Sequence, residues 1–242
     1  MRLFALADPH LGHAVDKAMD VFGPLWERHA ERMAANWREV VREEDWVLVP
    51  GDISWAMRLE EAAPDLEFLH ALPGRKVLLK GNHDYWWTSR AKVEKILPAS
   101  LVLLQNDCVD LGGGVGVIGT RGWTPPGAPR AGEQDATIFQ RELQRFELSA
   151  QSAAGRFATL VAMLHYPPLY AGLGETAFVP LLKRAGVVAC AYGHLHAGDH
   201  RFAVRGVRDG IRYHFVAADA IGFRPERIPL PGENEDAKVP AP

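Results

Sequence analysis

Side chains that can bind metal ions or move protons recur in five short segments of this 242-residue chain, each directly after an apolar run. Aspartate, asparagine and histidine carry this chemistry, and no cysteine lies within any of the five segments. Such a set suits divalent ions of the manganese, iron or zinc type, and not a structural thiolate site. The segments are Asp8-Pro9-His10, Gly51-Asp52, Gly81-Asn82-His83-Asp84, His165 and Gly193-His194-Leu195-His196.

Short apolar runs of this kind are typical of buried strands. In open α/β sheets, sites form beyond the carboxyl ends of the strands, so we expect the five segments to converge there although they extend from Asp8 to His196. Any one segment alone also fits a turn or a helix cap. The predicted strands are Leu3–Ala7, Trp46–Val49, Val77–Leu79, Val115–Gly119, Thr159–Leu164 and Val187–Tyr192.

The ligand-type side chains in these segments are too many for one catalytic ion with open positions. They suit two ions that share one carboxylate, and two metals about 3.5–4 Å apart with a water between them are a device for displacement at phosphorus. We expect Gly81 to let the chain bend before the third segment. The seven candidate ligands are Asp8, His10, Asp52, Asn82, His165, His194 and His196.

Helical patterns separate several of the predicted strands, which indicates an α/β arrangement in the first half of the chain. The second half is richer in strands. There, Arg201–Arg205 and Ile211–Ala217 are predicted to form a hairpin across Gly206–Gly210, as part of a second sheet. The predicted helices cover about Phe22–Arg42, Leu59–Leu72, Trp86–Leu97 and Asp135–Ala153.

A long loop with several prolines and glycines, Thr120–Glu133, is a candidate lid or pocket wall, because loops of this length often carry function. Within it, Trp123 is a candidate substrate contact and Arg121 a candidate partner for a phosphate. Trp86 and Trp87 are interpreted as core residues, since burial of large aromatics at the start of a helix is the simpler role.

The ordered series Asp-x-His, Gly-Asp, Gly-Asn-His-Asp, His and Gly-His-x-His resembles that of the calcineurin-like metallophosphoesterase superfamily. The resemblance covers about Met1 to Phe223. It implies a four-layer α/β/β/α sandwich, in which two mixed β-sheets are flanked by helices. The domain would span residues 1–224, and a Pro-rich tail from Pro225 to Pro242 would be loosely ordered.

The resemblance also implies a role for each residue. Asp52 would bridge two divalent ions, and a hydroxide between them would attack phosphorus. His83 would act as the general acid on the leaving oxygen, and Asp84 would orient it. Manganese is the favoured ion, with iron, zinc, cobalt and nickel as alternatives. The first ion would be held by Asp8, His10 and His196, and the second by Asn82, His165 and His194.

The composition of the chain argues against some classes of binding partner. A formal net charge of −3 gives no basic footprint for nucleic acid, although a nucleotide substrate stays possible. Two isolated cysteines, Cys108 and Cys190, and no signal-peptide or membrane-length apolar run indicate a cytoplasmic protein. A phosphate mono- or diester is the expected substrate. The alternatives are a cyclic-nucleotide phosphodiesterase, a protein phosphatase, or an inactive metal-binding scaffold of the same fold, and the oligomeric state stays open.

Overall fold

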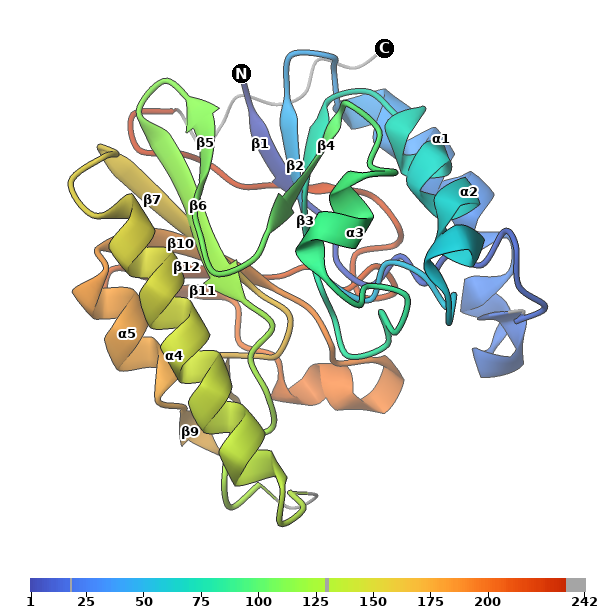
Figure 1. Cartoon of the computed structure of the whole chain (residues 1–242). Coiled ribbons are helices and arrows are strands. Elements are labelled where there is room, and N and C mark those ends of the chain that lie inside the picture. Colours follow the sequence, from blue (N-terminus) through green and yellow to red (C-terminus); the bar gives the residue numbers. More distant parts are fainter. Residues whose placement is uncertain (18, 129–130, 234–242) are drawn as a thin grey trace.

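The computed structural model describes residues 1–17, 19–128 and 131–233. Two mixed β-sheets pack face to face and helices cover the outer face of each, which confirms the predicted α/β/β/α sandwich (Figure 1). The first sheet contains, in order, β13 (Glu226–Arg227), β1 (Leu3–Ala5), β2 (Trp46–Pro50), β3 (Arg75–Leu79) and β4 (Leu101–Leu104). The second contains, in order, β11 (Gly206–Arg208), β12 (Ile211–Phe215), β10 (Val187–Tyr192), β7 (Thr159–Leu164), β6 (Val115–Thr120) and β5 (Val109–Gly112).

The helices divide between the two outer layers. Those packed on the first sheet are α1 (His29–Val40), α2 (Leu59–His70) and α3 (Arg90–Glu94), and those on the second are α4 (Asp135–Ala153) and α5 (Phe178–Arg184). Shorter elements are the 3-10 helices Met19–Phe22, Pro24–Trp26 and Ala197–Phe202 and the small hairpin of β8 (Leu169–Tyr170) and β9 (Gly174–Glu175). None of the helices in the described ranges is long and apolar enough to cross a membrane.

The strands are apolar throughout because both of their faces are buried. In β1, Phe4 packs among the helices of the first outer layer, whereas Leu3 and Ala5 pack between the two sheets. In β7 the same alternation places Ala162 with the second outer layer and Met163 between the sheets. Uninterrupted apolar runs in the sequence thus correspond to the two central layers of the sandwich.

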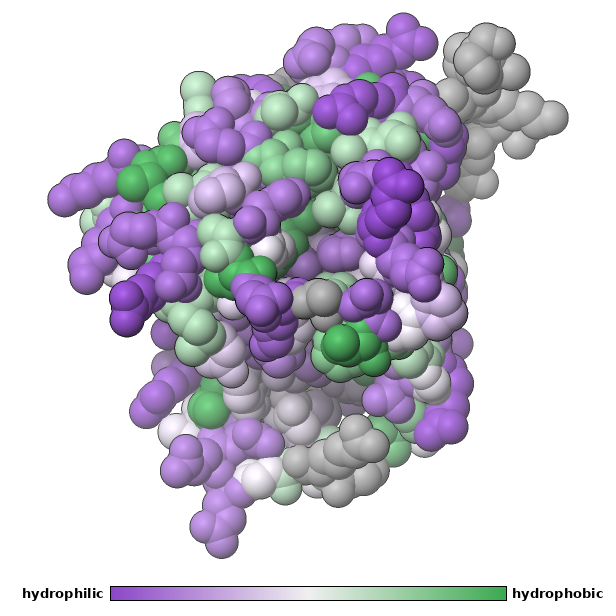
Figure 2. All heavy atoms as spheres, turned by 90° about the vertical axis from the view of Figure 1, so that its right-hand side faces the viewer, coloured by the Kyte–Doolittle hydropathy of each residue, from purple (hydrophilic) through white to green (hydrophobic). Residues whose placement is uncertain are grey.

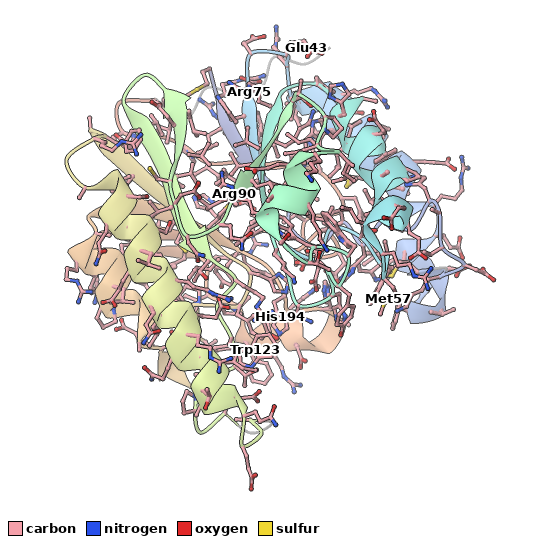
Figure 3. All side chains as sticks on the ribbon, viewed as in Figure 1. Glu43, Met57, Arg75, Arg90, Trp123 and His194 are labelled. Carbon is pink, nitrogen blue, oxygen red and sulfur yellow. The ribbon has the colours of Figure 1, made fainter. Side chains whose placement is uncertain are left out.

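The strands that precede the five segments end at one side of the molecule. β2 runs parallel to β1 and β3, and β10 runs parallel to β7, so the carboxyl ends in each sheet share an edge. The two edges adjoin, because the Ala7 N–H donates to the Val216 carbonyl at 2.8 Å. In Figure 3, His194 and Trp123 lie at this end, opposite Arg75 at the start of β3.

Three predicted elements differ from the structure. The helix predicted over about Phe22–Arg42 begins only at His29, and Met19–Phe22 and Pro24–Trp26 are 3-10 helices. The hairpin exists, but its turn is Asp209-Gly210, with both residues at positive φ (49° and 81°), so that β11 begins only at Gly206. An Asp-Gly pair in this conformation matches the twist of a two-residue hairpin. Arg201 and Phe202 belong instead to the 3-10 helix Ala197–Phe202.

The helix expected from Trp86 is also shorter than predicted. It begins at Arg90, because Trp86 and Trp87 are buried in the turn that follows Asp84. Their assignment to the core is confirmed.

The expected loose tail from Pro225 is wrong for its first residues. Glu226 and Arg227 form β13, which pairs antiparallel with β1, and Ile228 is fully buried. The edge of the first sheet needs a partner for its backbone groups, and this outweighs the proline-rich composition. Residues 234–242 lie outside the described residues.

Candidate metal centre

The five segments meet at the common edge of the two sheets. The Asp8 N–H donates to the Gly51 carbonyl at 3.0 Å, which joins the first segment to the second. Asp8 Oδ2 accepts the His194 N–H at 2.9 Å, which joins the first sheet to the second. The Gly193 N–H donates to the His165 carbonyl at 3.1 Å. Backbone hydrogen bonds and one bond to the Asp8 carboxylate therefore hold the candidate ligands together.

Three candidate ligands form a first group. The ligand atoms of Asp8, His10 and His196 all lie within 4.8 Å of one another. His10 Nε2 is 3.3 Å from His196 Nε2, and His196 Nε2 is 4.0 Å from Asp8 Oδ1. The group combines one carboxylate with two imidazoles, a common set for a divalent transition metal.

A second group surrounds the fully buried His165. Its Nε2 lies 2.6 Å from Asn82 Oδ1 and 3.3 Å from His194 Nδ1. Asp52 connects this group with the first, because its Oδ2 is 3.4 Å from His165 Nε2 and 3.9 Å from His10 Nε2. The seven predicted ligands are thus brought together as two groups with one carboxylate between them.

The ring tautomers show that these groups fit a cation. His165 Nδ1 lies 2.9 Å from the Pro50 carbonyl and His196 Nδ1 lies 3.0 Å from Asp219 Oδ1, so each Nδ1 donates its proton outward. The Nε2 atoms then face inward. The Nε2 of His165 carries a proton toward the oxygens of Asp52 and Asn82, and a metal ion would take the place of that proton. Asp8 Oδ1 is buried and accepts no hydrogen bond from the described residues. Lone pairs that face one another in a buried site are satisfied by a positive ion.

The electrostatics agree with this geometry. Burial raises the pKa of Asp8 to about 7 and lowers that of His10 to about 3. Burial also disfavours charge on His165, but the Asp52 and Asp8 carboxylates outweigh it and raise the pKa of His165 to about 9. Two opposing effects also act on Asp52. Burial raises its pKa, but the surrounding histidines, above all His165, outweigh burial and hold the pKa well below its usual range. Buried anionic oxygens in this arrangement favour a cationic centre.

The ligands also share an unusual backbone conformation. Asp8, His10, Asp52 and His194 all have positive φ, between 45° and 74°. Non-glycine residues in the left-handed region carry roughly 1–2 kcal/mol of strain each. Four such residues at one sheet edge indicate that ligand placement, and not chain stability, determines the conformation here.

Two motif glycines are required for close approach. A Cβ on Gly81 would overlap the Asp52 carboxylate, and one on Gly193 would overlap the Asp8 carboxylate. Gly81 does not have positive φ, so it is needed for this contact and not, as expected, for a bend. Gly81 and Gly193 therefore each make room for a carboxylate from another segment.

His83 lies beside the two groups, as predicted. Its ring centroid is 4.6 Å from that of Trp55 and 5.9 Å from that of His10, and among the described residues the ring makes no hydrogen bond. Its backbone N–H donates to Asp52 Oδ1 at 2.8 Å. Burial lowers the pKa of His83. The ring is consequently available to a group bound at the metal centre.

Asp84 has a different role from the one expected. Its Oδ1 accepts the Ile53 and Ser54 N–H groups and Trp86 Nε1, and its Oδ2 accepts the Gly81 N–H at 2.7 Å. These bonds occupy both oxygens, and within the described part of the chain the carboxylate makes none to the His83 ring. Asp84 braces the two loops that carry Asp52 and Asn82, because a buried carboxylate seeks several N–H donors.

Arg121 and Trp123 form part of a stacked wall. Tyr166 lies on the His194 ring at 3.7 Å between centroids, Trp123 lies 5.1 Å from Tyr166, and the Arg121 guanidinium is 4.3 Å from the Trp123 ring. Arg121 also forms an ion pair with the buried Glu142 at 3.2 Å, so it is engaged within the protein. This wall supports the ring of His194, one of the candidate metal ligands. Contact of Arg121 and Trp123 with the substrate is still a prediction.

The prediction missed Asp219, which binds His196 Nδ1 and is 3.0 Å from His200 Nε2. It follows the apolar end of the β12 region, Val216–Ala218, so the rule that found the other segments could have found it. Trp55, which stacks on His10 at 4.8 Å, gave no comparable signal.

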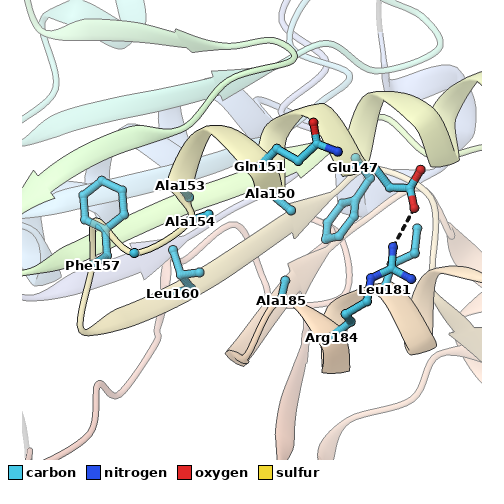
Figure 4. A pocket seen from close by; sticks show the side chains of 12 residues that line it. Glu147, Ala150, Gln151, Ala153, Ala154, Phe157, Leu160, Leu181, Arg184 and Ala185 are labelled. Carbon is cyan, nitrogen blue, oxygen red and sulfur yellow. Dashed lines mark hydrogen bonds and ion pairs between the residues drawn. The ribbon is translucent and has the colours of Figure 1, made fainter.

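A separate groove of about 440 Å³ lies between α4 and α5 on the outer side of the second sheet (Figure 4). It is lined largely by small and apolar side chains such as Ala150 and Leu160. Its one ion pair in the close-up joins Glu147 to Arg184 at 2.5 Å. Among its described lining residues the groove contains no histidine, so it lacks a ligand set like that of the strand-end site.

Several solved structures have a similar fold. Among solved structures, the chain is similar to the phosphopantetheinyl hydrolase PptH from Mycobacterium tuberculosis, with 16% identity, a TM-score of 0.59, and 96% of this chain and 98% of that chain covered. It is also similar to TT1561 of Thermus thermophilus, with 12% identity, a TM-score of 0.54, and 94% and 98% covered. A third neighbour is GAP50, the anchor in the inner membrane complex of Plasmodium, with 11% identity, a TM-score of 0.54, and 91% and 72% covered.

These identities establish the fold alone. No curated protein sequence matches the chain. The family model of the calcineurin-like phosphoesterases, however, matches residues 1–198, which include all seven candidate ligands and His83. The chain belongs to the calcineurin-like phosphoesterase family.

Proposed function

We propose that the protein is a two-metal phosphoesterase that hydrolyses phosphate mono- or diesters with water as the nucleophile. The family, the two ligand groups and the convergent lone pairs support this proposal. Manganese is the ion we favour, and iron, zinc, cobalt or nickel also suit a mixed imidazole and oxygen set. One ion would be held by Asp8, His10 and His196, the other by Asn82, His165 and His194, and both by Asp52.

The position of Asp52 is the observation that carries the proposal. Its Oδ2 lies within 4 Å of a ring nitrogen in each group, at 3.9 Å from His10 and 3.4 Å from His165. Its other oxygen accepts the His83 N–H. A shared carboxylate is what two ions about 3.5–4 Å apart require.

The chain's own residues have distinct tasks in the reaction. Two bound ions would supply a nucleophilic water at neutral pH and offset the charge on the phosphate. Asp219 and the Pro50 carbonyl fix the tautomers of His196 and His165, which keeps their Nε2 atoms directed inward. His83, with its ring unbonded to the described protein, would donate a proton to the leaving oxygen. Trp55 packs against the His83 ring, with 4.6 Å between the ring centroids.

An inactive scaffold is the rival function. The description of GAP50 as an anchor shows that a protein of this fold is known for attachment. A scaffold has no need of a complete ligand set, strained ligands and a free histidine beside them, and this chain has all three. We therefore favour catalysis.

Within catalysis, a cyclic-nucleotide phosphodiesterase and a protein phosphatase are alternatives to a general phosphoesterase. The net charge of −3 offers little attraction for a nucleic acid backbone, which argues against a nuclease. Both cysteines are free, in keeping with a cytoplasmic setting for the proposed enzyme.

The proposal is tested with protein reconstituted with each candidate metal and assayed on 4-nitrophenyl phosphate, phenyl phosphate, bis(4-nitrophenyl) phosphate, a cyclic nucleotide and a phosphoprotein. His83→Asn should lower kcat roughly 10²–10³-fold on phenyl phosphate and much less on 4-nitrophenyl phosphate, whose leaving group needs no acid. The control is His70→Asn, an exposed histidine at the end of α2.

Two outcomes would count against the proposal. Equal activity of His83→Asn and the parent enzyme on phenyl phosphate would remove His83 as the acid. Failure to hydrolyse any of these esters with any of the metals would favour the scaffold.

A further inference from the structure

A cavity of about 540 Å³ opens beside His10 and is lined by residues of the segment from His10 to Glu31. Besides His10 its lining includes Trp26, which lies 5.8 Å from the His10 ring. The cavity reaches the metal centre at His10, and Lys17, which also lines it, lies on Trp55, the ring that contacts both His10 and His83. A group that leaves the phosphate past His83 would therefore move toward this cavity.

One side of the cavity presents His13, which a buried carboxylate holds in place. Asp65, fully buried on α2, accepts the backbone N–H of His13 at 2.9 Å and its Nδ1 at 2.6 Å. The Ser54 hydroxyl also donates to Asp65. Because Nδ1 is engaged, Nε2 is the ring nitrogen that remains for the cavity. In its imidazolium form, which pairs with the Asp65 carboxylate, the ring would donate Nε2–H to an anion there. The His13 side chain is 38% exposed, so it is oriented but accessible.

The other side presents the Lys17 ammonium, which rests on an aromatic ring. Lys17 Nζ lies 3.6 Å from the Trp55 ring centroid, a cation–π contact. Within the described ranges, no carboxylate lies within 4 Å of this ammonium. Trp55 therefore places an unpaired cation close to His83, whose ring centroid is 4.6 Å from the same indole.

The outer part of the cavity differs in charge. Asp16, Asp20 and Glu27 are exposed along it, and Arg28 is paired with Glu31. The face of the molecule that turns this segment to the viewer is predominantly hydrophilic, with scattered hydrophobic residues (Figure 2). These exposed acids repel a long polyanion, whereas Lys17 on Trp55 and the His13 imidazolium attract a single anion beside them.

We propose that this cavity receives the leaving group, and that Lys17 and His13 bind a second anionic group carried by it. The preferred substrates would be small phosphoesters whose leaving alcohol bears a second phosphate. This inference rests on the proposed phosphoesterase function. Neither residue is a metal ligand or touches the reacting phosphate, so their effect falls on substrate choice.

Kinetics on a matched pair of esters tests the proposal. Propane-1,3-diyl bisphosphate and 3-hydroxypropyl phosphate differ by one phosphate on the leaving alcohol. The manganese-loaded parent enzyme should show kcat/KM about tenfold higher for the bisphosphate, mainly through KM. Lys17→Met and His13→Gln should each remove most of this preference and change kcat/KM for the monophosphate less than about twofold. The controls are Lys92→Met on α3 and His70→Gln on α2, both exposed.

A binding measurement keeps this inference separate from the proposed function. Propane-1,3-diyl bisphosphonate and propylphosphonate are not hydrolysed, so calorimetric titration of the manganese-loaded protein reports binding without turnover. The bisphosphonate should bind about tenfold more tightly, and Lys17→Met should abolish the difference. Equal binding of the two phosphonates, or equal effects of Lys17→Met and Lys92→Met, would overturn the subsite. Normal phosphonate discrimination without hydrolysis of any ester would instead refute the proposed function alone.

Discussion

At the scale of single residues, the site depends on groups that hold the ligands and do not themselves face the metal centre. Asp219 binds His196 Nδ1, the Pro50 carbonyl binds His165 Nδ1, and Asp84 accepts four N–H groups from the loops around Asp52. Each fixes a tautomer or a loop. The distances among the ligands therefore follow from hydrogen bonds outside the centre as much as from the ligands themselves.

Asp219 allows a direct test of this dependence. Asp219→Asn should weaken manganese binding about 10–100-fold, because the amide no longer favours the Nδ1–H tautomer of His196 as the carboxylate does. The matched control is Asp110→Asn, an exposed position on β5. Calorimetric titration with manganese measures both variants. Unchanged affinity in Asp219→Asn would show that the His196 ring is oriented by its packing alone.

At the scale of elements, the ends of the strands approach one another so closely that side chains are excluded at two positions. Gly81 leaves room for the Asp52 carboxylate and Gly193 for the Asp8 carboxylate. In both cases the loop after one strand packs on the carboxylate that follows another. The motif glycines are thus packing features of the junction between strands.

Gly193→Ala should displace the Asp8 carboxylate, lower the free energy of unfolding by about 1–3 kcal/mol and weaken manganese binding. Gly198→Ala is the matched control, since a Cβ there meets no atom within 4 Å. Thermal unfolding and metal titration of both variants check the expectation. Equal stability and equal affinity of the two variants would mean that the junction can open at little cost.

The buried Lys76 on β3 should make the stability of the protein depend on pH. Its side chain is fully buried, its ammonium donates to the Leu72 carbonyl, and the Trp37 ring lies 5.9 Å away. Burial lowers the pKa of Lys76 to about 8, below the ordinary value of 10.5. Between these values the unfolded chain binds more protons than the folded one, so Lys76 makes the unfolding free energy rise with pH across this window.

Lys76→Met should remove that rise and stabilise the protein by about 1–3 kcal/mol at pH 7, where the parent protein keeps a charge buried. Urea unfolding at pH 7 and at pH 9.5 measures both effects, with Lys92→Met as the exposed control. A parent protein whose stability shows no more dependence on pH than the variant would contradict a lowered pKa for Lys76.

At the scale of the whole molecule, strand ends are local signals and were sufficient to predict that the ligands meet. The four layers were expected from the family resemblance that the order of the motifs carries. The parts that it could not predict depend on distant partners. Asp84 finds its donors on the loop after β2, and Glu226 pairs with β1 at the far end of the chain. The start of β11 depends on the two-residue turn Asp209-Gly210. The sequence has glycines at both 206 and 210 and does not show which of them lies in the turn.

Two sheets and five loops are arranged so that one carboxylate, Asp52, lies between two ligand groups. The central claim is that the folded chain holds two ions at this position. It is most directly tested by electron paramagnetic resonance of the metal-free protein during titration with manganese. The predicted result is saturation at two equivalents per chain with the signal of an exchange-coupled pair, lost in Asp52→Asn. Saturation at one equivalent, or the signals of isolated ions only, would contradict the account.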